Sequence, residues 1–150
     1  MAIKQFPRQV LFSSATGEWA TPTLLFQDLD QEFRFELDAA ASEANAKCPR
    51  FYTKKRDGLA RPWAPLRTFV NPPYGRAVGC WVLKAYTEWK RGALVVMLLP
   101  VRTCTGWFHQ FIYHQAEIRF LKGRLKFGGA KNGAPFPSMI VIFRPGQHPQ

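Results

Sequence analysis

The chain has 150 residues, of which 47% are hydrophobic and 15% aromatic, and 21 Lys and Arg against 10 Asp and Glu give a formal net charge of +11. This composition excludes an intrinsically disordered chain and predicts one globular domain over residues 1–150. The longest apolar run, residues 93–99, is far shorter than a membrane span, and residues 1–9 contain no apolar signal segment. We therefore expect a cytoplasmic protein without a membrane partner.

The basic charge is concentrated in the later part of the chain. Residues 1–46 hold three basic and seven acidic side chains, whereas residues 47–150 hold 18 basic and three acidic ones. A strong positive field favours a polyanionic partner, so we predict contact with nucleic acid. The charge by itself does not separate DNA from RNA.

The cysteines and histidines indicate neither a disulfide framework nor a metal site. The three cysteines are odd in number and widely spaced, without a Cys-x-x-Cys motif, and no histidine stands at ligand spacing from them. We expect buried free thiols in a reducing compartment and no metal.

The N-terminal part of the chain predicts an arm and then a helix. Residues 1–12 have the character of a flexible basic arm. Thr21 is a suitable N-cap and Pro22 suits the first helical position, so we expect a helix over residues 22–33. Its apolar side chains recur at helical spacing: Leu25, Phe26, Leu29 and Phe33.

A strand and a long basic loop follow this helix. Alternating apolar and polar side chains over residues 33–38 predict a strand, which runs into the small residues 39–42 where a backbone could approach a ligand. Residues 45–65 have poor periodicity and many basic side chains. We expect a functional loop there, with at most a short strand near Phe51 and Tyr52.

The remaining elements alternate between strands and helices. A strand over residues 66–70 ends at Asn71-Pro72-Pro73-Tyr74-Gly75, because the two prolines cannot donate to a ladder. A helix is predicted around residues 78–89, a buried strand over residues 94–99, a helix around residues 107–112, and closing strands over residues 117–121 and 139–143. A glycine-rich loop spans residues 128–135.

Alternation of this kind predicts an α/β fold with a mostly parallel central sheet. Ligands bind at the carboxyl ends of parallel strands. Asp38, Asn71 and Pro100 would all lie at that edge.

The segment Asn71-Pro72-Pro73-Tyr74 has the groups needed to act on a planar exocyclic amine. Such an amine is a weak nucleophile, and acceptors for its hydrogens favour a tetrahedral nitrogen. Asn71 offers a side-chain carbonyl and Pro72 a main-chain carbonyl, held stiffly by the prolines. Tyr74 could stack on a base taken out of a duplex. The alternative is a rigid turn without a chemical role.

This tetrapeptide matches the [DNS]-P-P-[YFW] motif of amino-methyltransferases. More closely, residues 17–143 resemble the small phage- and plasmid-type (Dam-like) DNA N-6-adenine methyltransferases. The resemblance rests on an ordered set of segments: residues 19–22, 35–40, 57–59, 69–75, 100–103 and 135–138. It implies a reduced Rossmann-like S-adenosylmethionine-dependent methyltransferase fold that methylates adenine N6 in double-stranded DNA. It also implies a bacterial host cell, with a phage or plasmid as a possible source of the gene.

The resemblance also implies roles for individual residues. Asn71, Pro72, Pro73 and Tyr74 match the catalytic motif, and a flipped adenine would enter their site. Cofactor-binding roles fall on six residues: Trp19, Thr21, Pro22, Asp38, Ala39 and Asp57. The helix N-terminus after Thr21 could bind the methionine carboxylate, or Thr21 could be a plain cap. Asp38 could hold the methionine ammonium or a ribose hydroxyl, or simply begin a turn.

The sequence departs from the larger members of the family in its cofactor half. The usual Phe-x-Gly-x-Gly loop is absent and residues 38–42 stand in its place, about thirty residues before Asn71. The loops over residues 47–61 and 128–135 are candidates for DNA contact, with five basic residues expected near phosphate: Lys54, Lys55, Arg56, Arg102 and Lys131.

Two other functions remain open from the sequence. The same tetrapeptide serves methylation of guanine in RNA and of glutamine in proteins, by resemblance to those families. Alternatively, the chain could be a non-catalytic DNA-binding module in which the prolines only form a turn.

Overall fold

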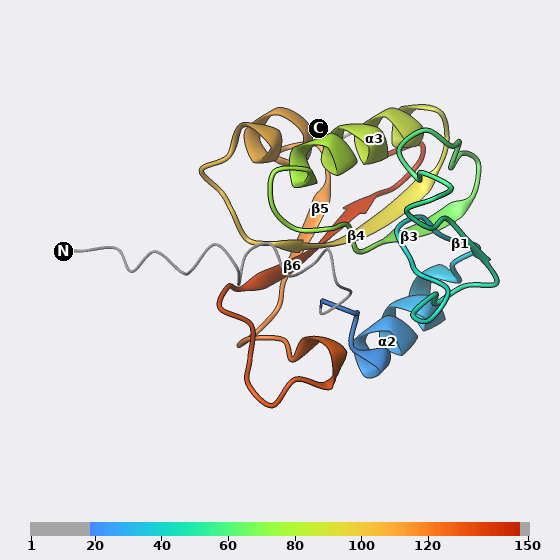
Figure 1. Cartoon of the computed structure of the whole chain (residues 1–150). Helices are drawn as coiled ribbons and strands as arrows, with labels where there is room; N and C mark the ends of the chain where they lie inside the picture. The colour runs from blue at the N-terminus through green and yellow to red at the C-terminus, as the bar shows by residue number, and fades with distance from the viewer. Residues whose placement is uncertain (1–18, 148–150) are drawn as a thin grey trace.

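The centre of the molecule is a six-stranded mixed sheet with the strand order β2-β1-β3-β4-β6-β5 (Figure 1). The computed structural model describes residues 19–147, so the arm predicted over residues 1–12 lies outside the described residues. The strands are β1 (Leu37–Asp38), β2 (Arg50–Phe51), β3 (Arg67–Val70), β4 (Leu94–Pro100), β5 (Glu117–Phe120) and β6 (Ser138–Phe143). Strands β1 to β4 pair in parallel, whereas β6 is antiparallel to both of its neighbours. The predicted α/β class and mostly parallel sheet are confirmed.

Helices cover both faces of this sheet. Helix α2 (Thr23–Phe33) lies on one face, and α3 (Val78–Lys90) lies on the other with the short π-helical segment η2 (Phe108–Ile112) (Figure 1). On the α2 side, Phe26 packs edge to face on Phe69 with a centroid distance of 5.1 Å. On the α3 side, Trp89 packs on Phe143 at 5.3 Å. In residues 19–147, no helix has the length and apolar character to span a bilayer.

The start of α2 differs from the prediction. Pro22 occupies the N-cap position with extended ψ, and no side chain caps the helix. The predicted N-cap role of Thr21 is therefore wrong. Its hydroxyl is engaged elsewhere, by the side chain of Asn71.

The end of α2 also shortens the predicted strand. Arg34 adopts the left-handed conformation (φ 52°) and terminates the helix, and the Phe35 N–H donates to Asp30 Oδ1 at 2.9 Å. Residues 33–36 therefore form the end of the helix and the turn after it, and β1 comprises only Leu37 and Asp38.

The long basic loop is anchored to α3 through a buried carboxylate. Glu88 is fully buried, and its Oε2 accepts the backbone N–H groups of Trp63 and Ala64 at 2.9 Å each. Burial opposes ionisation, but the hydrogen bonds from Lys84 and from these two N–H groups lower the pKa of Glu88 to about 2. The Trp63 indole in turn donates to the Gly58 carbonyl at 2.9 Å. The segment predicted as a loop is thus fixed at several points.

The thiols only partly follow the expectation. Cys48 is buried, but Cys80 and Cys104 are exposed, on α3 and in the turn after β4. Position 80 falls outside the buried stripe of α3, which explains its exposure. Across residues 19–147, no cluster of three His, Cys, Asp or Glu side chains could hold a metal ion.

Candidate active site

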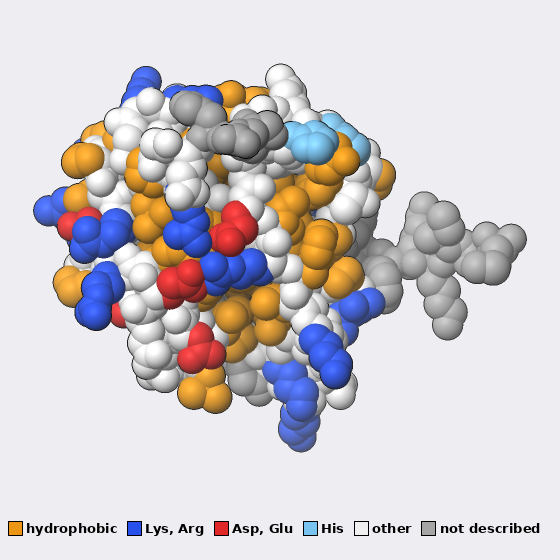
Figure 2. Space-filling model, turned by 180° about the vertical axis from the view of Figure 1, so that it is seen from behind, with side chains coloured by type: hydrophobic (Ala, Val, Ile, Leu, Met, Phe, Trp, Pro, Cys, Tyr) orange, Lys and Arg blue, Asp and Glu red, His pale blue; other side chains and the backbone are white. Residues whose placement is uncertain are grey.

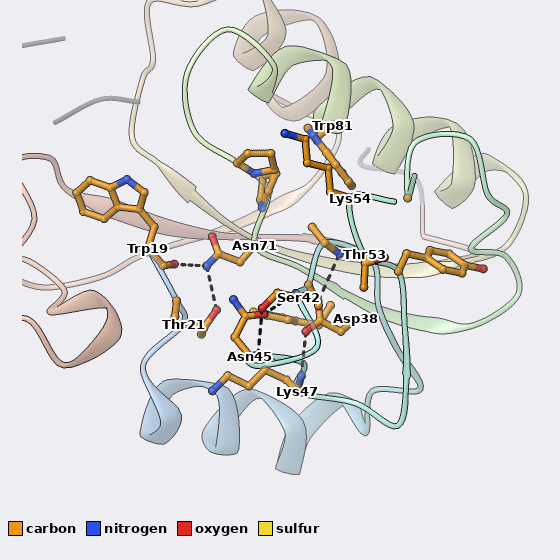
Figure 3. Close-up of a pocket in the computed structure, with 18 of the residues that line it drawn as sticks. Trp19, Thr21, Asp38, Ser42, Asn45, Lys47, Thr53, Lys54, Asn71 and Trp81 are labelled. Atoms are coloured by element: carbon orange, nitrogen blue, oxygen red, sulfur yellow. Dashed lines mark hydrogen bonds between the residues drawn. The ribbon is translucent and has the colours of Figure 1, made fainter. Parts of the chain in front are cut away.

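The candidate site lies where the strand order of the sheet changes direction. From β1 the chain moves outward to β2 and then returns to β3 on the other side of β1. Ligands in parallel sheets bind at such a switch point, beyond the carboxyl ends of the strands. A pocket of about 410 Å³ is present there (Figure 3). Its lining includes Asp38 from the end of β1 and Asn71 from the end of β3.

The side chain of Asn71 is held in one orientation by residues far away in the sequence. Its Nδ2 donates to the Trp19 carbonyl at 2.7 Å and to Thr21 Oγ1 at 3.0 Å (Figure 3). A main-chain carbonyl can only accept a hydrogen bond, so the amide nitrogen must face Trp19. Asn71 Oδ1 is then left buried, without a hydrogen-bond donor among residues 19–147.

This free oxygen is the chemically important feature of the site. Buried polar groups are usually paired, and an unpaired one requires an explanation. Oδ1 is a fixed acceptor on a residue that lines the pocket, and its predicted role in binding amino hydrogens stays a prediction. Pro72 is buried, and its carbonyl accepts no hydrogen bond from another described residue. Two acceptors are therefore available at the end of β3.

Tyr74 lies in a different environment from the one that a stacking role requires. It is only 4% exposed and does not line the pocket, and its hydroxyl donates to the Leu98 carbonyl at 3.1 Å. Burial raises the pKa of this phenol well above its usual value. Its ring belongs to an aromatic cluster that we define as Trp19, Tyr74, Phe127 and Phe136. Every pair of these rings has a centroid distance of 6.2 Å or less.

Asp38 lies on the side of Asn71 that faces away from the aromatic cluster, and it binds the backbone of the loop that follows β1. It is 3% exposed, and its two carboxylate oxygens accept the N–H groups of Lys47 at 3.0 Å and Ala40 at 3.4 Å. Burial is the dominant effect and raises the pKa of Asp38 to about 6. An ionised, buried carboxylate at this edge of the pocket is a suitable partner for a cation.

The other residues predicted to bind a cofactor divide into two groups. Trp19, Thr21 and Asp57 line the pocket together with Asp38, whereas Pro22 and Ala39 do not. Ala39 is fully buried, and its neighbours Ala40, Ala41 and Ser42 form the lining in its place. Gly58 packs so closely against the Ala39 carbonyl that a β-carbon at this position would collide with it.

The predicted DNA-contacting residues do not form one cluster. Lys54 lines the pocket, Lys55, Arg56 and Lys131 are exposed, and Arg102 is partly buried just after β4. Figure 2 shows Lys and Arg side chains gathered at the lower right, where the segment between β5 and β6 lies. This segment holds three further exposed basic residues: Lys122, Arg124 and Lys126. No ion pair within residues 19–147 involves any of the three.

Several residues of the pocket were not predicted from the sequence. Lys47, Tyr52 and Thr53 line the pocket from the basic loop, which the sequence predicted to be a functional loop in contact with DNA. Trp81 lies on the buried face of α3, and it also lines the pocket while stacking on Trp63. The signal for Trp81 was its position in the first turns of the helix that directly follows the proline tetrapeptide.

The chain is similar in sequence to known methyltransferases. The sequence profile of the family described as DNA N-6-adenine-methyltransferase (Dam) matches residues 10–150. The chain is 34% identical over 109 residues to a DNA N-6-adenine-methyltransferase of Escherichia phage T1, covering 71% of this chain and 45% of that protein. It is 32% identical over 136 residues to a protein of the same description from Haemophilus phage HP1, covering 85% of this chain and 78% of that one. A putative methyltransferase of Escherichia coli K12, YfdM, is 38% identical over 64 residues, which cover 38% of this chain and 70% of that protein.

Proposed function

Because the chain belongs to the DNA N-6-adenine-methyltransferase (Dam) family, we propose that it methylates the N6 amino group of adenine in DNA with S-adenosylmethionine as methyl donor. The free, buried Oδ1 of Asn71 is the observation that carries this proposal. It is a fixed acceptor at the end of β3, beside a pocket of suitable size for a small-molecule cofactor. The expected place of action is the cytoplasm of a bacterial host.

The fold fits a reduced Rossmann-like methyltransferase. Strands β3 and β4 are connected through α3, and the pocket lies at the switch point between β1 and β3. Beyond β1, the segment of residues 39–66 contributes only the two-residue strand β2. A shortened cofactor half of this kind agrees with the missing glycine-rich loop.

The chemistry depends on the acceptors at the end of β3. The amino nitrogen of adenine is a weak nucleophile because its lone pair is delocalised into the ring. Asn71 Oδ1 and the Pro72 carbonyl would accept the two amino hydrogens and favour a tetrahedral nitrogen. S-adenosylmethionine, when bound, supplies an electrophilic methyl group on a positively charged sulfur. The surplus proton can leave after transfer, so no charged general base is required.

The pocket contains groups that match the parts of this cofactor. Asp38, which lines the pocket, would hold the methionine ammonium, and the backbone N–H groups at the start of α2, just beyond the lining residue Thr21, would bind the carboxylate. The apolar side chains of Leu59, Phe69 and Trp81 suit the adenine ring. Asp57 is a candidate partner for a ribose hydroxyl.

The DNA is proposed to approach from the side of the aromatic cluster. The target adenine would leave the duplex and stack on Tyr74, and the exposed basic residues would contact phosphates. Exchanging Lys131 or Arg124 for Gln should then weaken DNA binding uniformly across sequences. Each exchange should reduce the slope of log K against log salt by about 1. Arg91→Gln, on the exposed end of α3, is the matched control and should leave the slope unchanged.

The direct test is methyl transfer with labelled cofactor to unmethylated double-stranded DNA, followed by base analysis. We expect label in N6-methyladenine, and sequencing that reports modified bases gives the target site. Label in RNA guanine or protein glutamine would support the other methyltransferase functions. DNA binding without cofactor binding in a calorimetric titration would support a non-catalytic module.

A further inference from the structure

The aromatic cluster leaves no room for a base beside Tyr74. All pairs of its four rings are in contact, with centroid distances between 5.1 and 6.2 Å. A purine between two parallel rings needs about 7 Å, twice the usual stacking distance of about 3.5 Å. Trp19 and Tyr74 are loosely stacked at 6.2 Å with an interplanar angle of 30°. One ring must therefore move before an adenine can stack on Tyr74.

Trp19 is the member of the cluster that can leave most easily. Phe127 and Phe136 are 2% and 8% exposed, whereas Trp19 is only half-buried. A hydrogen bond from the Gly128 N–H to the Ala20 carbonyl at 3.0 Å holds the backbone beside both Phe127 and Trp19, so a displacement of Trp19 involves its side chain. The Trp19 indole Nε1, by contrast, is buried without a hydrogen-bond acceptor among the described residues.

The Trp19 indole occupies the face of Tyr74 on which the substrate is expected to stack. It is a planar bicyclic ring with an N–H donor, and it is stacked on Tyr74. The main-chain carbonyl of the same residue contacts Asn71 (Figure 3). We propose that the side chain of Trp19 holds the place of the target adenine in the DNA-free protein and is displaced from Tyr74 when the base enters. This inference rests on the proposed function.

The exchange would satisfy two polar groups that are unpaired in the free protein. Displacement exposes the Trp19 indole N–H to water, and an entering amino group gives Asn71 Oδ1 its missing donor. Both gains offset the unstacking of the base from the duplex. The main-chain carbonyl of residue 19, not its side chain, orients Asn71, so the ring can move while the acceptor stays in position.

Fluorine NMR of the full-length protein tests this directly. The chain has five tryptophans. After labelling with 5-fluorotryptophan, the resonance of Trp19 is assigned by its absence in Trp19→Phe. In the presence of S-adenosylhomocysteine, a saturating duplex with the methylation site should shift this resonance, while those of the buried Trp63 and Trp89 stay in place. The same duplex with an abasic position at the target should bind without the shift.

Kinetics supply an independent test with the same residue. Trp19→Ala removes the competing ring but keeps the carbonyl that orients Asn71, so the KM for DNA should fall when S-adenosylmethionine is saturating. If Trp19 has already left Tyr74 in about a third to a tenth of wild-type molecules, its removal should lower the KM for DNA by about three- to tenfold. A residue that only packs would lower kcat or stability without lowering KM.

The outcomes separate this inference from the proposed function. If the wild-type protein methylates adenine and the Trp19 resonance does not move on saturation with the target duplex, the inference is wrong and the function stands. An equal shift with the abasic duplex also overturns it, because phosphate contact alone would then move the ring. If no adenine is methylated, both fail together. The NMR measurement on the wild-type protein decides the question even if Trp19→Ala does not fold.

Discussion

The two regions on either side of Asn71 differ in whether they have space for a ligand in the free protein. Towards β1 lies an open pocket of about 410 Å³, whose carboxylate Asp38 already accepts two backbone hydrogen bonds. Towards β6 lies the aromatic cluster, whose rings fill the space beside Tyr74. Under the proposed function, the cofactor would bind with little rearrangement, whereas entry of the base would require one ring to move. Substitutions on the two sides should therefore affect different steps.

The largest loss of activity is expected from substitution of Asn71, which lies between the pocket and the aromatic cluster. Asn71→Ala removes the fixed acceptor and should reduce methyl transfer at least about 100-fold, the usual cost of losing a preorganised transition-state hydrogen bond. Cofactor affinity should change by no more than about threefold, because the side chains proposed to bind the cofactor are untouched. Initial rates with labelled cofactor and calorimetric titration measure the two quantities. Asn71→Asp keeps an acceptor and should retain more activity; an active Asn71→Ala enzyme would contradict the mechanism.

On the pocket side, Gly58→Ala should be the most damaging change. The new β-carbon would collide with the Ala39 carbonyl, which belongs to the backbone and cannot rotate away. We expect a loss of about 1–3 kcal/mol in the free energy of unfolding and a 10- to 100-fold weaker cofactor affinity. Thermal unfolding and calorimetry measure these effects. Gly106→Ala adds a β-carbon in open space and should leave both unchanged; equal effects of the two variants would refute this account.

The pH dependence of cofactor binding should show the state of Asp38. Burial raises its pKa to about 6, so the carboxylate is ionised at pH 7 and mostly protonated at pH 5. Affinity for a cationic ammonium should fall about tenfold between these values. Cys48 stays neutral in this range, because burial and the nearby carboxylates raise its pKa to about 12. Calorimetric titrations from pH 5 to pH 8 provide the profile.

Two further measurements sharpen this prediction. Asp38→Asn should bind the cofactor weakly, with a flat profile. Without cofactor, the free energy of unfolding should change with pH in the opposite direction to the cofactor affinity. Because the pKa of Asp38 is raised in the folded state, this group contributes stability below its unfolded pKa of 3.8, and that contribution is lost as pH rises through about 6. A cofactor affinity that is constant from pH 5 to pH 8 would exclude Asp38 as the partner of the ammonium.

The smallest effect is expected at Thr21. Thr21→Val removes one of the two acceptors of Asn71 Nδ2, while the Trp19 carbonyl remains. A lost neutral hydrogen bond of about 1 kcal/mol corresponds to a reduction in kcat of about fivefold. Thr21→Ser keeps the hydroxyl and should behave like the wild type. A cofactor affinity that falls as far as kcat would instead indicate that Thr21 acts by binding the cofactor.

Local patterns predicted the elements well but not the contacts between them. The predictions of a strand over residues 94–99 and of a helix around residues 78–89 were correct, because apolar runs and helical spacing are local signals. The position of Asn71 at a strand end followed from the two prolines. The N-cap role of Thr21 was wrong because its hydroxyl bonds to a side chain 50 residues away, which no local pattern contains.

Glu88 shows a signal that the sequence contained and that was not used. It lies three residues after Ala85 and seven after Trp81, on the same buried face of α3. A carboxylate on an apolar helix face predicts a specific buried partner. Its partners are the backbone N–H groups of Trp63 and Ala64 in the basic loop, which the sequence could not identify.

The bond between Asn71 and the Trp19 carbonyl has a consequence for how activity arises during folding. The donor and acceptor are 52 residues apart and come from separate segments that meet only when β3 and the start of α2 have docked. A partly folded chain can contain the proline tetrapeptide yet lack an oriented amide. Recovery of methyl transfer after dilution from denaturant should therefore follow the last docking step of the N-terminal segment, and not the earlier appearance of helical signal.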